Sequence, residues 1–116
     1  MAISDNSTAQ IDERFSDKFP NVVTEAGTSI TLGKQHWDAF VVCSAAGAVT
    51  VTIPESTSDA GKVFPIGTTV TIFAKGAGGV TIAKTGADVL TGTAAAAQNI
   101  CRKVTKVAAT EWVAWV

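Results

Sequence analysis

The chain has 116 residues, of which 47% are hydrophobic and 16% are charged, and its formal net charge is −1 at pH 7. This length suits one domain, and the absence of a basic cluster predicts no nucleic-acid partner, because such proteins concentrate Lys and Arg on one face. The charged fraction is below the roughly 25% of typical soluble domains, which favours a surface partly covered by further copies of the chain.

Residues 1–20 differ in composition from everything that follows. They are polar and charged, and their apolar side chains are widely spaced: Ile3, Ile11, Phe15 and Phe19. The last three stand at i, i+4 and i+8, along one face of a helix, but so thin a stripe does not hold a helix alone. We therefore favour an N-terminal arm that becomes ordered on a partner, with a short amphipathic helix before Pro20 as the alternative.

The same segment carries no targeting signal. It lacks the basic and apolar regions of a secretory signal peptide. No apolar run in the chain approaches the roughly 20 residues that span a bilayer. These patterns predict a protein that is made in a cytoplasm, stays soluble or assembles there, and does not bind membranes.

Short β-branched segments separated by turn residues predict an all-β domain over residues 21–116. The tripeptide Val-Thr-Ile occurs three times, at residues 51–53, 70–72 and 80–82. Alternation puts its Val and Ile on a buried face and its Thr on the other. We expect strands at residues 22–24, 29–32, 37–43, 49–53, 68–74, 79–83, 98–107 and 111–116. Turn signals about every ten residues suit a small β-sandwich, jelly roll or barrel of about eight or nine short strands.

The predicted connections carry the residues that turns need. Pro54 ends the first Val-Thr-Ile strand, because proline cannot donate to a ladder, and residues 55–65 form the longest predicted loop. The glycine cluster at residues 75–79 is expected to join its flanking strands as a β-hairpin. Residues 108–110 are expected to join the last two strands as a second hairpin.

Few side chains in the sequence suggest catalysis or metal binding. His36 is the only histidine, and without a strained serine elbow we interpret it as a surface or turn residue, not a member of a catalytic triad. Cys43 and Cys101 stand in apolar stretches, which predicts two buried thiols; a disulfide is the alternative, disfavoured in a reducing cytoplasm. Two carboxylates that meet in space would be the remaining route to hydrolysis. We predict no metal, no cofactor and no enzymatic activity.

Two tryptophans stand in the last predicted strand. Trp112 and Trp115 are three residues apart, so alternation places them on opposite faces. One can fill the core while the other points outward and marks a contact surface. The alternative is that loops shield both within one chain. Both residues are therefore candidates for a subunit interface.

Residues 49–116 resemble a β-rich domain of structural proteins from tailed bacteriophages. The parts follow the same order: a Thr-Val strand ending at Pro54, a Ser/Thr loop, Phe-Pro-Ile-Gly-Thr at 64–68 before a Val-Thr-Ile strand, the glycine cluster before the next, and Thr-Glu-Trp-Val at 110–113. Two features depart from the pattern. The usual long ending stops at Val116, and Cys101-Arg102-Lys103 replaces a more apolar strand start.

Such domains occur at the ends of tail-fibre proteins and as small head-decoration, or cement, proteins. The short segment before the domain favours the second setting, so the resemblance implies a homotrimeric virion protein on the outer capsid surface, assembled in the host cytoplasm. It also implies that the arm binds the major capsid protein, with Ile3, Ile11, Phe15 and Phe19 as anchors. The alternative is a tail or tail-fibre component that binds a host-surface glycan.

Overall fold

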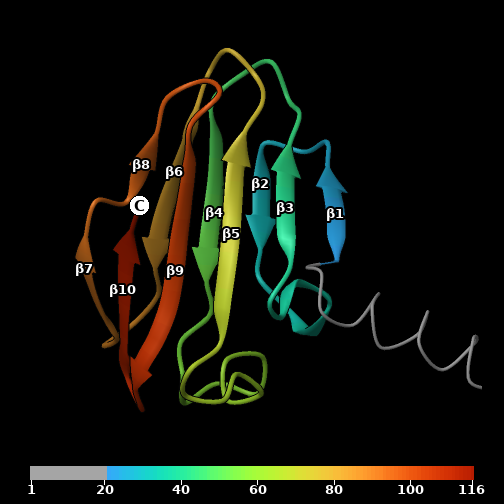
Figure 1. The fold of residues 1–116 in the computed structure, drawn as a ribbon. Coiled ribbons are helices and arrows are strands. Elements are labelled where there is room, and N and C mark those ends of the chain that lie inside the picture. Colours follow the sequence, from blue (N-terminus) through green and yellow to red (C-terminus); the bar gives the residue numbers. More distant parts are fainter. Residues whose placement is uncertain (1–20) are drawn as a thin grey trace, which may run out of the picture.

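The computed structural model describes residues 21–116, which form ten β-strands in two sheets and one turn of 3-10 helix (Figure 1). The all-β prediction is therefore confirmed, with slightly more strands than expected. In chain order the elements are β1 (Val22–Glu25), β2 (Ser29–Thr31), η1 (Lys34–His36), β3 (Phe40–Cys43), β4 (Val49–Ile53), β5 (Thr69–Ala74), β6 (Val80–Lys84), β7 (Val89–Gly92), β8 (Ala95–Ala96), β9 (Cys101–Ala108) and β10 (Glu111–Trp115).

The first six strands pass alternately from one sheet to the other. β1, β3 and β5 are parallel neighbours in a six-stranded sheet, and β2, β4 and β6 are parallel neighbours in a four-stranded sheet (Figure 1). Each coil of the chain therefore adds one strand to each sheet, as in a solenoid. An antiparallel strand ends the parallel stack in each sheet. In the four-stranded sheet β8 pairs with β6. In the six-stranded sheet β9 pairs with β5, β10 pairs with β9, and β7 pairs with β10.

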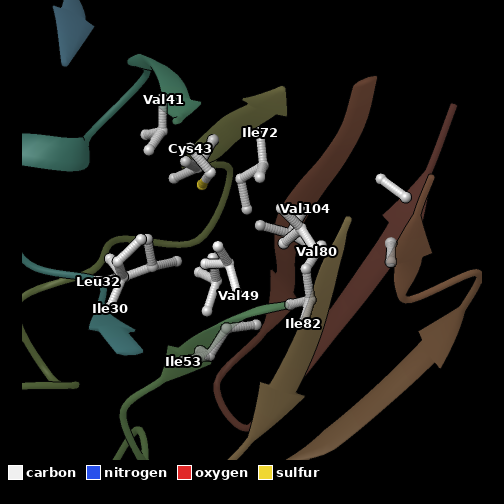
Figure 2. Close-up of a cluster of buried hydrophobic side chains, with 14 of the residues drawn as sticks. Ile30, Leu32, Val41, Cys43, Val49, Ile53, Ile72, Val80, Ile82 and Val104 are labelled. Atoms are coloured by element: carbon white, nitrogen blue, oxygen red, sulfur yellow. The ribbon is translucent and has the colours of Figure 1, made fainter. Parts of the chain in front are cut away.

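The core lies between the two sheets and consists of similar side chains stacked in register (Figure 2). Ile30, Val51 and Ile82 oppose one another across β2, β4 and β6, and Val41 opposes Ile72 across β3 and β5. None of these side chains is more than 5% exposed. Branched side chains that repeat at the strand spacing of about 4.8 Å leave little space between neighbouring coils.

The three Val-Thr-Ile tripeptides lie in β4, β5 and β6, as predicted. In each copy the Val and Ile are buried, and the Thr points away from the core. The first and third copies are neighbours in the four-stranded sheet, and the second copy lies in the other sheet. The three copies therefore contribute buried side chains to the core from both sheets.

The predicted hairpin around the glycine cluster is wrong. β5 and β6 belong to different sheets, and the residues between them form an arch from one sheet to the other. Both strands have one apolar face, and those faces meet across the core instead of lying side by side. β5 pairs in parallel with β3 and extends the six-stranded sheet. β6 pairs in parallel with β4 and extends the four-stranded sheet.

Glycine is needed in this arch because it packs closely on the arch between β3 and β4. The two arches are hydrogen-bonded backbone to backbone, with Gly78 N–H donating to the carbonyl oxygen of Ala46 over 3.0 Å. A Cβ atom on Gly76 would overlap the carbonyl oxygen of Ala45. The glycine cluster therefore reflects stacking between coils and not a tight hairpin turn.

The hairpin at the C-terminal end is confirmed, because β9 and β10 pair antiparallel. β3 begins at Phe40, three residues later than predicted. The preceding residues form η1, and Asp38 has a φ of 51°, a left-handed conformation that does not continue a strand. This turn brings His36 into the interior.

Gly76→Ala should destabilise the fold, because side-chain rotation cannot relieve an overlap with backbone. We expect the free energy of unfolding to fall by about 1–3 kcal/mol, the usual cost of overpacking, as measured by urea denaturation. Gly47→Ala is the matched control, because its Cβ would meet nothing nearer than a Thr28 methyl group at 4.0 Å. Equal losses in the two variants would contradict the stacked arches.

Candidate functional site

The structure separates the two candidate interface tryptophans. Trp112 is 1% exposed and packs edge-on against Phe64, with ring centroids 5.6 Å apart. It therefore belongs to the core of the chain, which corrects its assignment to a subunit interface. The predicted opposite orientation of the pair is confirmed, because Trp115 is 44% exposed on the outer side of the six-stranded sheet.

Trp115 is held in place by polar contacts on this outer side. Its indole Nε1–H donates to the hydroxyl oxygen of Thr105 over 2.9 Å. The ammonium group of Lys103 lies 4.8 Å from the ring centroid, a cation–π distance. These contacts fix one edge and one face of the ring and leave much of its surface open to a partner. The four predicted capsid anchors, Ile3, Ile11, Phe15 and Phe19, lie outside the described residues.

His36 was predicted to be a surface or a turn residue, and it lies in the turn η1 and not at the surface. The residue is fully buried. Its Nδ1 accepts a hydrogen bond from Gly33 N–H over 2.9 Å, so the ring proton is on Nε2, which lies 2.8 Å from Glu25 Oε2. Both ring nitrogens are therefore engaged, and neither is free to take a proton from a nucleophile. This arrangement supports a structural role for His36.

The two cysteines are both free but occupy different environments, so the prediction of two buried thiols is half wrong. Cys43 is fully buried, whereas Cys101 is exposed. Burial raises the pKa of the Cys43 thiol, and the nearby Glu25 carboxylate raises it further. Because the thiolate is the nucleophilic form, Cys43 is held in its unreactive state. Its side chain serves as part of the core (Figure 2).

No cluster of metal ligands and no membrane-crossing helix occurs in the described part of the chain. Residues 21–116 bring no three His, Cys, Asp or Glu side chains together in a way that could hold a metal ion. The same residues contain no helix of the length and apolar character that a membrane crossing requires.

The most distinctive surface is the outer face of the six-stranded sheet. The strand residues that alternate away from the core include just two charged side chains, Lys103 and Glu111. Apolar side chains gather in two parts of this face. The first part, which we call the aromatic patch, consists of Val22, Phe40, Val42, Phe73 and Cys101. The second part consists of Val89, Val107, Val113 and Trp115.

Strand register brings the members of the aromatic patch together. Val22 opposes Phe40 across β1 and β3, and Phe73 opposes Cys101 across β5 and β9. The rings of Phe40 and Phe73 stack with centroids 6.0 Å apart and an interplanar angle of 23°. Val22 is 69% exposed, so the patch is open at the β1 edge. An apolar surface of this kind is typical of a contact site for another protein segment.

The outer face of the four-stranded sheet has a different character. Its outward strand residues are mostly hydroxyl-bearing: Ser29, Thr31, Thr50, Thr52 and Thr81. Ser29, Thr50 and Thr81 stand in one row across β2, β4 and β6. Threonine combines β propensity with a polar group, so this face is suited to contact with water.

Comparisons with known proteins add no relative. No family model, curated protein or solved structure matches the chain. The resemblance to phage structural proteins therefore stays a prediction from the order of residues in 49–116.

Sequence reasoning missed the aromatic patch, although one signal for it was present. Residues 40–43, Phe-Val-Val-Cys, are apolar at every position, so both faces of this strand are apolar. Uninterrupted apolar strands are typical of sheets that are covered on both sides. The run therefore predicts that β3 presents apolar side chains on its outer face as well as toward the core.

We expect the stability of the protein to fall as the pH rises above about 8.5, the ordinary pKa of a cysteine thiol. Above this pH the unfolded chain releases the Cys43 proton, which the folded chain retains because its thiol pKa is raised. Below that pH the folded and the unfolded chain both hold the Cys43 proton, so ionisation of this thiol does not lower the free energy of unfolding. Cys43→Ala should flatten the decline in the free energy of unfolding, measured by urea denaturation between about pH 8 and 10 under reducing conditions.

Cys101→Ala is the control for this measurement, because it removes an exposed thiol. The chain contains no tyrosine, so no phenol titrates in the same range. An unchanged decline in Cys43→Ala would show that the buried thiol does not couple ionisation to folding.

Proposed function

We propose that this chain is a virion structural protein that decorates the outer surface of a bacteriophage head and stabilises it. The observation that carries the proposal is the outer face of the six-stranded sheet, a broad surface with an aromatic patch and two charged strand residues. A surface of this composition gains free energy mainly by being covered, at about 25 cal/mol per Å² of apolar area. An apolar surface that is stabilised by being covered suits a protein that assembles with other copies or with a capsid.

The position of the arm strengthens this proposal. Residues 1–20 lead directly into β1, the edge strand of the six-stranded sheet. The last proposed capsid anchor, Phe19, therefore stands three residues before Val22, the first residue of the aromatic patch. Further copies of the chain would bring several arms to one capsid, and linked weak contacts then act together.

The interior chemistry is consistent with a structural, non-enzymatic role. The neutral Cys43 thiol and the fully engaged His36 ring are the residues that a nucleophilic mechanism would use. His36 accepts a hydrogen bond from Gly33 within the turn and bonds Glu25 in β1, which holds η1 against the first coil. We therefore assign this cluster to folding.

The proposal is tested by binding the purified protein to mature phage heads that lack decoration. Replacing Phe15 and Phe19 by Asp in the full-length chain should weaken binding at least 100-fold, because each buried Phe contributes about 1.5–3 kcal/mol and about 1.4 kcal/mol corresponds to tenfold. Ser16→Asp changes the charge at a neighbouring polar position and should bind as the unmodified chain does. Co-sedimentation with heads gives the affinities.

The location of the bound protein separates the two readings of the resemblance. Electron microscopy of decorated particles should show the protein on the head surface. Binding confined to tails, or to host-cell glycans, would contradict the proposal and support a tail component. Full head binding by the double-Asp variant would refute the anchoring role of the arm.

A further inference from the structure

A continuous row of side chains crosses the outer face from the beginning of β1 to the end of β10. Val22 opposes Phe40, Phe40 opposes Thr71, and Thr71 opposes Lys103 in β9. Lys103 in turn opposes Trp115. The row begins at the point where residues 1–20 join the fold, and its strand spacings give it a length of about 19 Å.

The sequence of the arm matches this row in length and chemistry. Phe19 stands three residues before Val22, and Ile11, Phe15 and Phe19 recur every fourth residue. Nine residues reach about 12 Å as a helix and about 27 Å when extended, which brackets the length of the row. Residues 11–19 contain three acidic and two basic side chains, so their net charge of −1 is opposite in sign to Lys103, the single cation of the row.

We propose that residues 11–19 dock on the outer face of their own chain in the free protein, with Phe15 and Phe19 on the aromatic patch. The occupant is the same chain because the tether between Phe19 and Val22 is so short. The link between Phe19 and Val22 is two residues long, Pro20 and Asn21, and short links give effective concentrations of about a millimolar. A second copy at micromolar concentration competes poorly with it.

Docking of this kind makes the arm and the face mutually protecting. The anchors that we assign to capsid binding are covered before the partner is met, and so is the apolar surface of the sheet. A partner must displace the arm, and both surfaces become available in one step. The inference concerns the free protein and does not rest on the identity of the partner.

Cys101 offers a direct probe of coverage, because it is exposed and opposes Phe73 within the patch. We would measure its alkylation by iodoacetamide in the full-length chain and in the variant with Phe15→Asp and Phe19→Asp. An arm–face Kd of about 0.1 mM at about 1 mM effective concentration covers the patch about 90% of the time. Alkylation of Cys101 should then be about tenfold slower in the unmodified chain.

Two controls accompany this experiment. Cys43 is fully buried, so its lack of alkylation verifies that each variant is folded. Ser16→Asp adds one negative charge between the anchors, against two in the double variant, and should leave Cys101 protected. Equal Cys101 rates in the unmodified chain and the double-Asp variant would overturn the proposal. Protection that disappears on dilution would also overturn it, in favour of docking by a second copy. Failure of head binding in the earlier experiment would leave this result unaffected.

Discussion

The fold depends on in-register stacking of branched side chains between two sheets. Ile30, Val51 and Ile82 stand in one ladder, and equivalent ladders line the opposite wall. Because parallel strands repeat at a constant spacing, every coil must place its arch directly on the arch of its neighbour. Arches at that spacing have no room for a Cβ at Gly76. The side-chain ladder therefore dictates both the core and the backbone of the turns.

The same stacking shapes both outer surfaces. Strand alternation assigns Val and Ile to the interior, and the remaining positions align in rows on the outside. In the four-stranded sheet these rows are hydroxyl-bearing, whereas in the six-stranded sheet they contain the stacked rings of Phe40 and Phe73. Identical core chemistry thus supports one face suited to water and one suited to a partner. The described part of the chain begins at residue 21, next to β1 at the edge of the second face.

Some polar side chains in the interior supply hydrogen-bond partners to the backbone. His36 joins the Gly33 N–H to the Glu25 carboxylate across the first coil. This chain of hydrogen bonds satisfies a buried imidazole that would otherwise cost about 1–3 kcal/mol. Cys43 lies near the same carboxylate and remains a neutral thiol. Residues that suggest catalysis in the sequence thus have structural partners in the fold.

The sequence by itself determined eight of the ten strands and their buried faces, because a period of two is a local property; β7 and β8 were not predicted. The bounds of β4 and the opposite orientations of Trp112 and Trp115 follow from alternation alone. Apart from the C-terminal hairpin, only the tertiary structure decided which strands pair, because an amphipathic strand buries its apolar face equally well in a hairpin or across an arch. That choice separates β5 from β6, places Trp112 in the core, exposes Cys101 and assembles the aromatic patch. A strand pairs with whichever sheet edge has free backbone hydrogen-bonding groups, and those edges belong to strands far away in the sequence. The local alternation of apolar and polar residues therefore does not specify the pairing.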